Sequence, residues 1–307
     1  MIFTIKNLIN RYFKKRDLVS QNSKLRILYC CCLLLFPLTS FAQQPPNGYQ
    51  VYNKIKFTET GQQDLTLDLF VPNNMDKPVP CIIVIQGGGF LSQDGQGFRQ
   101  FAEYIAKNKY AAALISYRGR PDHHYQTTIL DVKSAVSFVK INSAKYAIDP
   151  VKIGAMGRSA GGTLAALLAV AGDSVQVQAA VAYAGVFDFV ARFTDSSQIA
   201  HQPKLATTLQ TNSEWIGTPF STEAPEWKQA SASNHLDKND SPILFMHCKD
   251  DKVVSWIQSQ KMYEKMKNSG INSEIIYFEK GGHGFGSVEK ELFLKPMISF
   301  FKKQFEQ

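Results

Sequence analysis

The chain has 307 residues, of which 44% are hydrophobic and 20% are charged. This composition is that of a folded protein, so general disorder is excluded, and the length suits one large α/β domain or two small ones. The formal net charge is +8, but residues 1–42 hold seven basic residues and one acid. Most of the positive charge therefore lies in the N-terminal segment, and we expect no nucleic-acid partner.

The N-terminal segment has the pattern of an export signal. Lys24 and Arg26 precede an apolar run that ends in SFA at residues 40–42, a small-x-small site for signal peptidase. We therefore expect residues 1–42 to be a signal peptide with a long n-region, and the protein to be periplasmic or secreted. The alternative is an uncleaved anchor. The run is short for a membrane span and contains Pro37, so we expect no stable membrane anchor.

Beyond the signal peptide two cysteines remain, Cys81 and Cys248. Two cysteines in an exported domain can form one disulfide. Cys81 opens one predicted strand, however, and Cys248 closes another, which places them at opposite edges of a parallel sheet. We therefore expect two unpaired, mostly buried thiols.

The predicted elements begin after a flexible lead-in at residues 43–50. Residues 51–57 and 65–71 alternate apolar and polar side chains, as half-buried antiparallel strands do. Short, nearly continuous apolar runs, typical of strands covered on both faces, follow at 81–85, 111–117, 152–156, 179–184, 242–247 and 274–278. Three- and four-residue apolar spacing predicts helices at 97–108, 127–145, 159–171, 255–268 and 287–304. This order predicts an α/β fold with a mostly parallel central sheet, an antiparallel start and helices on both faces.

One interval, residues 186–240, is far longer than an ordinary crossover between two strands and is rich in aromatic residues. We interpret it as a small cap-like insertion beside the site and not as a second domain. Its tryptophans, Trp215 and Trp227, could line an acyl pocket or form a platform for a sugar, and the sequence does not separate these two roles.

A single serine stands at the junction between a predicted strand and an apolar helix. Residues 157–161 read GRSAG, which fits the G-x-S-x-G nucleophile elbow. Glycine on either side relieves crowding in the tight turn, and the Oγ of Ser159 is then held above the sheet at the start of the helix. The pattern also occurs in ordinary glycine turns, but the strand before it and the helix after it favour a nucleophile.

A serine nucleophile needs a base, which in this architecture follows an acid along the chain. We select His283, because it lies in a glycine-rich loop after the last predicted strand, where the imidazole can reach the elbow. His247 ends an apolar strand and is interpreted as a buried structural histidine. His201 and His235 lie in the insertion and have no supporting pattern.

The acid should orient the imidazole and stabilise its charged form. Residues 247–254 read HCKDDKVV and follow a predicted strand. We select Asp251 because D-x-x-V after the strand is the usual arrangement, and we expect Asp250 to be a solvated neighbour. Asp188, which follows the preceding strand, is a remote alternative.

The tetrahedral intermediate needs backbone amides that stabilise its oxyanion. Three glycines, Gly87, Gly88 and Gly89, end a predicted strand, and we expect the amides of Gly88, Gly89 and Ala160 to form the oxyanion hole. A phosphate-binding loop is excluded, because neither common glycine pattern of such loops fits. No metal or cofactor motif is present, and we expect no cofactor.

From about residue 50 onward the chain resembles the α/β-hydrolase superfamily of serine esterases. The motifs QGGGF, GRSAGG, HCKDDKVV and GGHGF are similar to those of bacterial acetyl xylan esterases, feruloyl esterases and relatives of hormone-sensitive lipase. The sequence departs from that pattern at Gln86, where a histidine is usual, and at Cys248, where a glycine is usual. Gln86 can still hydrogen-bond the loop, so we expect an intact oxyanion hole. The resemblance implies an α/β-hydrolase domain at residues 43–307.

The resemblance also implies the reaction, which is acyl transfer through Ser159, His283 and Asp251. The substrate is expected to be an acylated carbohydrate or another small ester. We expect removal of acetyl or feruloyl groups from plant polysaccharide such as xylan. The alternatives are a general short-chain carboxylesterase, a peptidase similar to the prolyl oligopeptidase group, and a binding protein without activity. The complete set of Ser, His and Asp argues against the last, and the sequence leaves the oligomeric state undetermined.

Overall fold

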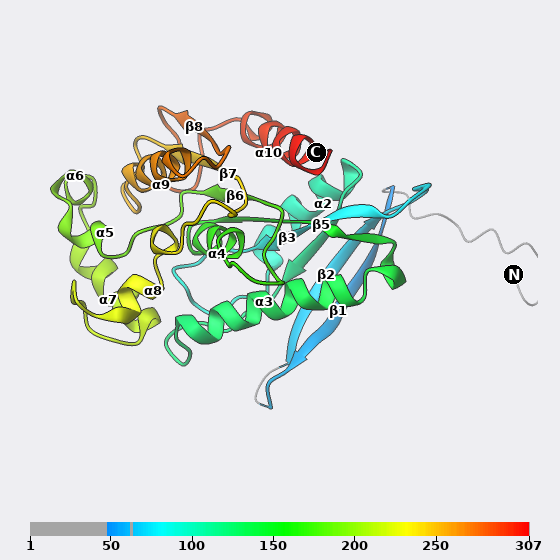
Figure 1. Ribbon diagram of the computed structural model, residues 1–307, viewed down its shortest axis with the longest axis horizontal. Helices are drawn as coiled ribbons and strands as arrows, with labels where there is room; N and C mark the ends of the chain where they lie inside the picture. The colour runs from blue at the N-terminus through cyan, green and yellow to red at the C-terminus, as the bar shows by residue number, and fades with distance from the viewer. Residues whose placement is uncertain (1–47, 62–63, 307) are drawn as a thin grey trace, which may run out of the picture. The chain divides into compact units, whose positions relative to one another are not determined.

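The computed structural model describes residues 48–61 and 64–306, so the predicted signal peptide lies outside the described residues. The described strands form one eight-stranded sheet with the order β1-β2-β4-β3-β5-β6-β7-β8 (Figure 1). The strands are β1 (Tyr49–Glu59), β2 (Asp64–Pro72), β3 (Val79–Ile85), β4 (Ala111–Ile115), β5 (Ile148–Arg158), β6 (Ala179–Tyr183), β7 (Ile243–Cys248) and β8 (Glu274–Phe278). Each corresponds to a predicted strand.

The sheet changes direction after its first two strands. β1 pairs antiparallel with β2, and β2 pairs antiparallel with β4. All pairs from β4–β3 to β7–β8 are parallel. The predicted mixed sheet with an antiparallel start is therefore confirmed. Because the later strands are parallel, the loops after them emerge at one edge of the sheet, where the predicted site residues lie.

Helices cover both faces of the sheet, which explains why its central strands carry no polar alternation. Within β3, Ile83 and Ile85 pack on one face with side chains of α3 (Tyr125–Ile141), α4 (Ala160–Ala169) and α9 (Ile257–Asn268). Ile82 and Val84 pack on the opposite face with α2 (Arg99–Lys107) and α10 (Lys290–Phe305). These five helices are the five that the sequence predicts. None of the helices in the described part of the chain is long and apolar enough to cross a bilayer.

The interval between β6 and β7 folds into short helices, which Figure 1 shows gathered away from the β1–β2 hairpin. They are α5 (Ala191–Thr194), α6 (Ser196–Ile199), α7 (Leu205–Ile216), α8 (Pro225–Gln229) and the 3₁₀ turn η3 (Ala232–Asn234). Trp215 and Trp227 are fully buried, and Trp215 stacks on Phe90 with ring centroids 3.8 Å apart. The two tryptophans therefore fasten this segment to the core, and neither is an exposed platform for a sugar.

Cys81 and Cys248 are both unpaired and buried. Burial raises the pKa of each thiol to about 12, so both stay protonated at neutral pH. The prediction of two unpaired, mostly buried thiols is confirmed.

We expect Trp215→Ala to lower the free energy of unfolding by about 3–5 kcal/mol, the usual cost of deleting a buried aromatic side chain. The matched control is Leu292→Ala in α10, whose side chain is 55% exposed and should change stability little. Urea unfolding of both variants measures this. A loss below about 1 kcal/mol for Trp215→Ala would show that the helical segment is not part of the cooperative core.

Candidate active site

Ser159 occupies a tight corner between β5 and α4. Its backbone has φ 57° and ψ −124°, a conformation that a residue with a Cβ adopts only under strain. The corner is held by a hydrogen bond of 2.7 Å from the Ser159 amide to the Tyr183 carbonyl. A Cβ at Gly161 would lie 2.1 Å from the carbonyl oxygen of Ile85, and one at Gly157 would lie 2.3 Å from Gly161. The two flanking glycines are therefore required by close backbone approach, as the elbow motif predicts.

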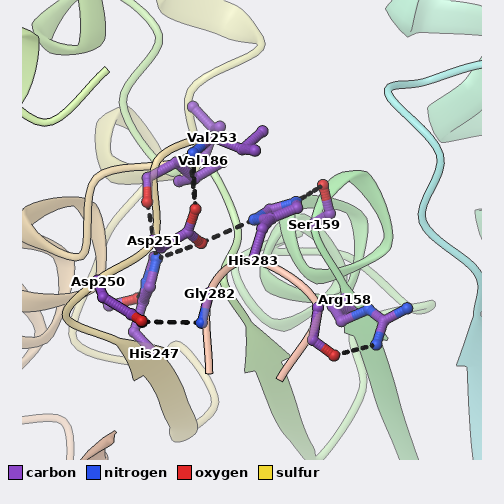
Figure 2. A network of polar contacts seen from close by, with 12 residues as sticks. Arg158, Ser159, Val186, His247, Asp250, Asp251, Val253, Gly282 and His283 are labelled. Atoms are coloured by element: carbon purple, nitrogen blue, oxygen red, sulfur yellow. Dashed lines mark hydrogen bonds and ion pairs between the residues drawn. The ribbon is translucent and has the colours of Figure 1, made fainter. Parts of the chain in front are cut away.

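His283 reaches this corner from the loop between β8 and α10, and Figure 2 shows it between Ser159 and Asp251. Its Nε2 lies 2.8 Å from Ser159 Oγ, and its Nδ1 lies 2.7 Å from Asp251 Oδ2. Because a carboxylate only accepts, a neutral His283 donates from Nδ1 and accepts the hydroxyl proton of Ser159 at Nε2. The structure thus brings the three predicted side chains into one chain of hydrogen bonds.

Asp251, in the loop after β7, is fully buried. Its Oδ2 faces His283 and His247, and its Oδ1 accepts from the amides of Val253 at 2.8 Å and Val254 at 3.0 Å. Burial by itself raises the pKa of this carboxyl, but the hydrogen bonds from His247 and His283 outweigh it and hold the pKa well below its usual range. Asp251 therefore stays ionised, as a residue that stabilises an imidazolium must.

His247 is buried, as predicted, but it also contacts the acid, which the sequence interpretation missed. Its Nε2 lies 3.2 Å from Asp251 Oδ2 and 3.0 Å from the Val254 carbonyl oxygen. Both neighbours are acceptors, so Nε2 carries the proton, and Nδ1 accepts from the hydroxyl of Ser259 in α9 at 2.7 Å. The four-residue spacing between His247 and Asp251 is the only signal in the sequence for this contact.

Asp250 corrects an expectation, because it is not merely a solvated neighbour. Its carboxylate accepts from the amides of Gly282 at 2.8 Å and Gly281 at 3.3 Å, directly before His283 (Figure 2). On the other side, Arg158 donates from Nη1 to the Gly284 carbonyl at 3.1 Å. The loop is therefore held immediately before and after its histidine. The sequence did not predict these contacts, since no motif links Asp250 or Arg158 with the backbone of this loop.

The glycine run after β3 approaches the elbow closely. A Cβ at Gly87 would lie 2.1 Å from the carbonyl oxygen of Arg158, so glycine is required there too. Gly89 and Ala160 line a cavity of about 280 Å³ together with Ser159. Gly88 is not among the described residues that line it. The geometry thus places two of the three predicted oxyanion-hole residues at the cavity wall beside Ser159.

The loop that carries the glycines is braced by its own side chains. Gln86, which replaces the usual histidine, donates from Nε2 to Gln93 Oε1 at 2.5 Å. Its backbone carbonyl accepts from the Tyr117 hydroxyl at 2.7 Å. Arg120 donates from Nε to the Gly89 carbonyl at 2.7 Å. Gln86 therefore hydrogen-bonds within the loop, as expected.

The remaining candidates lie outside this network. Asp188 accepts from the Ala191 amide at the start of α5 and from the Ser233 hydroxyl. His201 packs its ring edge-on against Trp256, and His235 bonds the Gln229 carbonyl. Within the described ranges no group of three or more His, Cys, Asp or Glu side chains is arranged to hold a metal ion.

Comparison with known proteins places the chain in a family. Residues 67–266 match the BD-FAE family, which is more than half of the chain. The chain belongs to the BD-FAE family. A probable carboxylic ester hydrolase, LipM of Mycobacterium tuberculosis, is 25% identical over 212 residues, which are 65% of this chain and 47% of that protein. The chain spans about half the length of the curated relatives it matches.

Solved structures similar to this BD-FAE chain include two esterases. A truncated carbohydrate esterase from gut microbiota has a TM-score of 0.73 and 25% identity, covering 86% of this chain and 99% of its own. A thermophilic esterase from Thermogutta terrifontis, solved with butyrate bound, has a TM-score of 0.69 and 25% identity, covering 84% of this chain and 95% of its own. The predicted α/β-hydrolase fold is confirmed by these matches and by the sheet.

We expect Asp250→Ala to slow covalent labelling of the protein by a fluorophosphonate probe by about ten-fold, since hydrogen bonds to a charged group contribute about 1.5–3 kcal/mol. The reason is that His283 loses the anchor of its loop, while Ser159 itself is unchanged. Asp76→Ala, at an exposed position, is the matched control. An unaltered labelling rate in a folded Asp250→Ala protein would show that this anchor does not position His283.

Proposed function

We propose that this BD-FAE protein is a serine ester hydrolase that removes acetyl or feruloyl groups from plant polysaccharide such as xylan. The observation that carries the proposal is the chain of hydrogen bonds from Ser159 Oγ through His283 to the buried, ionised Asp251. Ser159, at one end of this chain of hydrogen bonds, lines a cavity large enough for a short acyl group.

In the proposed reaction His283 takes the proton of Ser159 as Oγ attacks the ester carbonyl carbon. The carbonyl oxygen becomes an oxyanion, which the amides of Gly88, Gly89 and Ala160 stabilise. His283 then gives its proton to the leaving alcohol, and an acyl-enzyme remains on Ser159. Water attacks this intermediate with His283 again as the base, which releases the carboxylic acid and restores the hydroxyl of Ser159.

The carbohydrate part of the proposal is supported by the likeness to a carbohydrate esterase from gut microbiota. A second candidate is a general short-chain carboxylesterase. The observation that favours it is the full burial of Trp215 and Trp227, which removes the two aromatic platforms that the insertion could offer to a sugar. The two candidates share the same machinery and differ in the alcohol that leaves.

Export is also part of the proposal. It is supported by the basic stretch and the apolar run that end in the small-x-small site at residues 40–42. A mature N-terminus directly after residue 42, read by mass spectrometry of the protein expressed with its natural start, would agree with it. An intact residue 1–42 segment on the mature protein would contradict it.

We expect Ser159→Ala to lower hydrolysis of p-nitrophenyl acetate and acylated xylan by about 10³-fold or more, because the nucleophile is lost. Asp251→Asn should lower it by about 10³–10⁴-fold, because His283 loses the carboxylate that fixes its tautomer. The control is Ser269→Ala, at an exposed position at the end of α9. Released acetate, ferulate and p-nitrophenol are measured by chromatography and absorbance.

Each outcome separates the candidates. Release of acetate or ferulate from xylan that disappears in Ser159→Ala supports the carbohydrate esterase and names its acyl group. Cleavage of the small ester alone supports the general carboxylesterase and overturns the polysaccharide substrate. Cleavage of a proline-containing dipeptide amide in preference to either ester would support a peptidase instead.

A further inference from the structure

The cavity beside Ser159 carries an excess of positive charge. Four basic side chains are among the described residues that line it, and none of those residues is acidic. The basic residues are Arg120, Arg192, Lys204 and Lys252. A neutral acetyl or feruloyl ester makes no use of these charges, and only some of them have a counter-charge within the protein.

Arg120 is already neutralised. Its Nη1 lies 2.7 Å from Glu214 Oε2 in α7, and its Nε donates to the Gly89 carbonyl. This residue therefore braces the glycine loop and contributes little net charge to the cavity.

Arg192, in α5, is different, because it is only 3% exposed and its hydrogen-bond partners are all neutral. Its Nε donates to Gln202 Oε1 at 2.9 Å, its Nη1 to Asn212 Oδ1 at 3.0 Å and its Nη2 to the Val253 carbonyl at 2.7 Å. Among the described residues no carboxylate lies within ion-pair distance of it. A guanidinium has five N–H groups, so these three bonds leave two donors, one on each terminal nitrogen.

Asp251 is the charged group that interacts electrostatically with Arg192. Its carboxylate oxygens already accept hydrogen bonds from His283, His247 and two backbone amides. Burial lowers the pKa of Arg192 to about 9, against the attraction of Asp251, so the guanidinium keeps its charge at neutral pH. A buried cation with no carboxylate in direct contact is costly. In a cavity open to substrate, that cost is offset when an anion binds.

Two exposed lysines add further positive charge to the lining of the cavity. Lys204 directly precedes α7, and Lys252 directly follows Asp251; both are exposed. Neither forms an ion pair with a carboxylate in the described part of the chain. The cavity thus has a buried guanidinium in its wall and two free ammonium groups on its lining.

We propose that the ester hydrolysed here carries a carboxylate group, which binds Arg192 and is attracted by Lys204 and Lys252. This rests on the proposed ester hydrolysis and narrows its substrate class to acidic esters. The carboxylate belongs either to the acyl part, as in a half-ester of a dicarboxylic acid, or to the alcohol part, as in an acylated uronic acid. Arg192 is then a specificity residue that contacts substrate and takes no part in proton transfer.

The experiment compares matched acidic and neutral esters with the full-length protein, following acid release in a pH-stat. The acyl-side pair is monoethyl succinate and ethyl pentanoate. The alcohol-side pair is an acetylated methyl glucuronoside and the equally acetylated methyl glucoside. We expect the acidic ester of one pair to have the higher kcat/KM, chiefly through a lower KM, and the pair that shows this identifies which part carries the carboxylate.

Arg192→Gln should lower the acidic-to-neutral ratio of kcat/KM about ten-fold or more, as removal of a charged hydrogen-bond donor does. If Arg192 had a purely structural role, its substitution would lower kcat/KM for the acidic and the neutral ester by the same factor. Should Arg192→Gln fail to fold, the double variant Lys204→Gln, Lys252→Gln at exposed positions should still lower the ratio several-fold. Its charge-matched control is Lys77→Gln, Lys238→Gln, also at exposed positions, which should leave the ratio unchanged.

Equal kcat/KM for the acidic and neutral esters of both pairs in the wild type would overturn the inference. So would an unchanged ratio in both Arg192→Gln and the double lysine variant. In either case the proposed esterase function is still supported if the wild type hydrolyses the neutral esters and Ser159→Ala does not. Failure of the wild type to cleave any of the four esters would overturn the esterase function itself.

Discussion

The arrangement of the site depends on one buried carboxylate. Asp251 has no contact with solvent, so its charge is tolerable only because two imidazoles and two backbone amides donate to it. Those donors come from the end of β7, from the loop that follows it and from the distant loop of His283. The need to satisfy one charge therefore ties three segments together, and through His247 and Ser259 it extends to α9.

Backbone crowding fixes the other half of the site. β3 and the β5–α4 corner approach so closely that Gly87 nearly touches the Arg158 carbonyl and Gly161 nearly touches the Ile85 carbonyl. No side chain beyond hydrogen fits at either place. The same close approach brings the glycine loop beside Ser159, so Gly89 and Ala160 line one cavity with the nucleophile.

The helical segment between β6 and β7 contributes to both packing and chemistry. Trp215 stacks on Phe90, directly after the glycine run, so the segment holds the loop that borders the cavity. Arg192 and Asn212 from the same segment line that cavity and are hydrogen-bonded to each other. A segment that appears from its length to be a simple cover thus supplies the buried charge on which the proposed substrate class depends.

The sequence by itself determined the order of strands and helices, because apolar periodicity records which faces are buried. It also indicated Ser159, Asp251 and His283, since each follows a strand in a motif whose glycines or spacing reflect local backbone geometry. Tertiary structure alone decided the roles of Asp250, His247 and Arg192, and the burial of Trp215 and Trp227. The roles of Asp250 and Arg192 and the burial of the two tryptophans arise from contacts between segments distant in the chain, and a short-range pattern carries no record of them. His247 contacts residues near it in the chain, but those contacts form only because the loop after β7 folds back onto the strand.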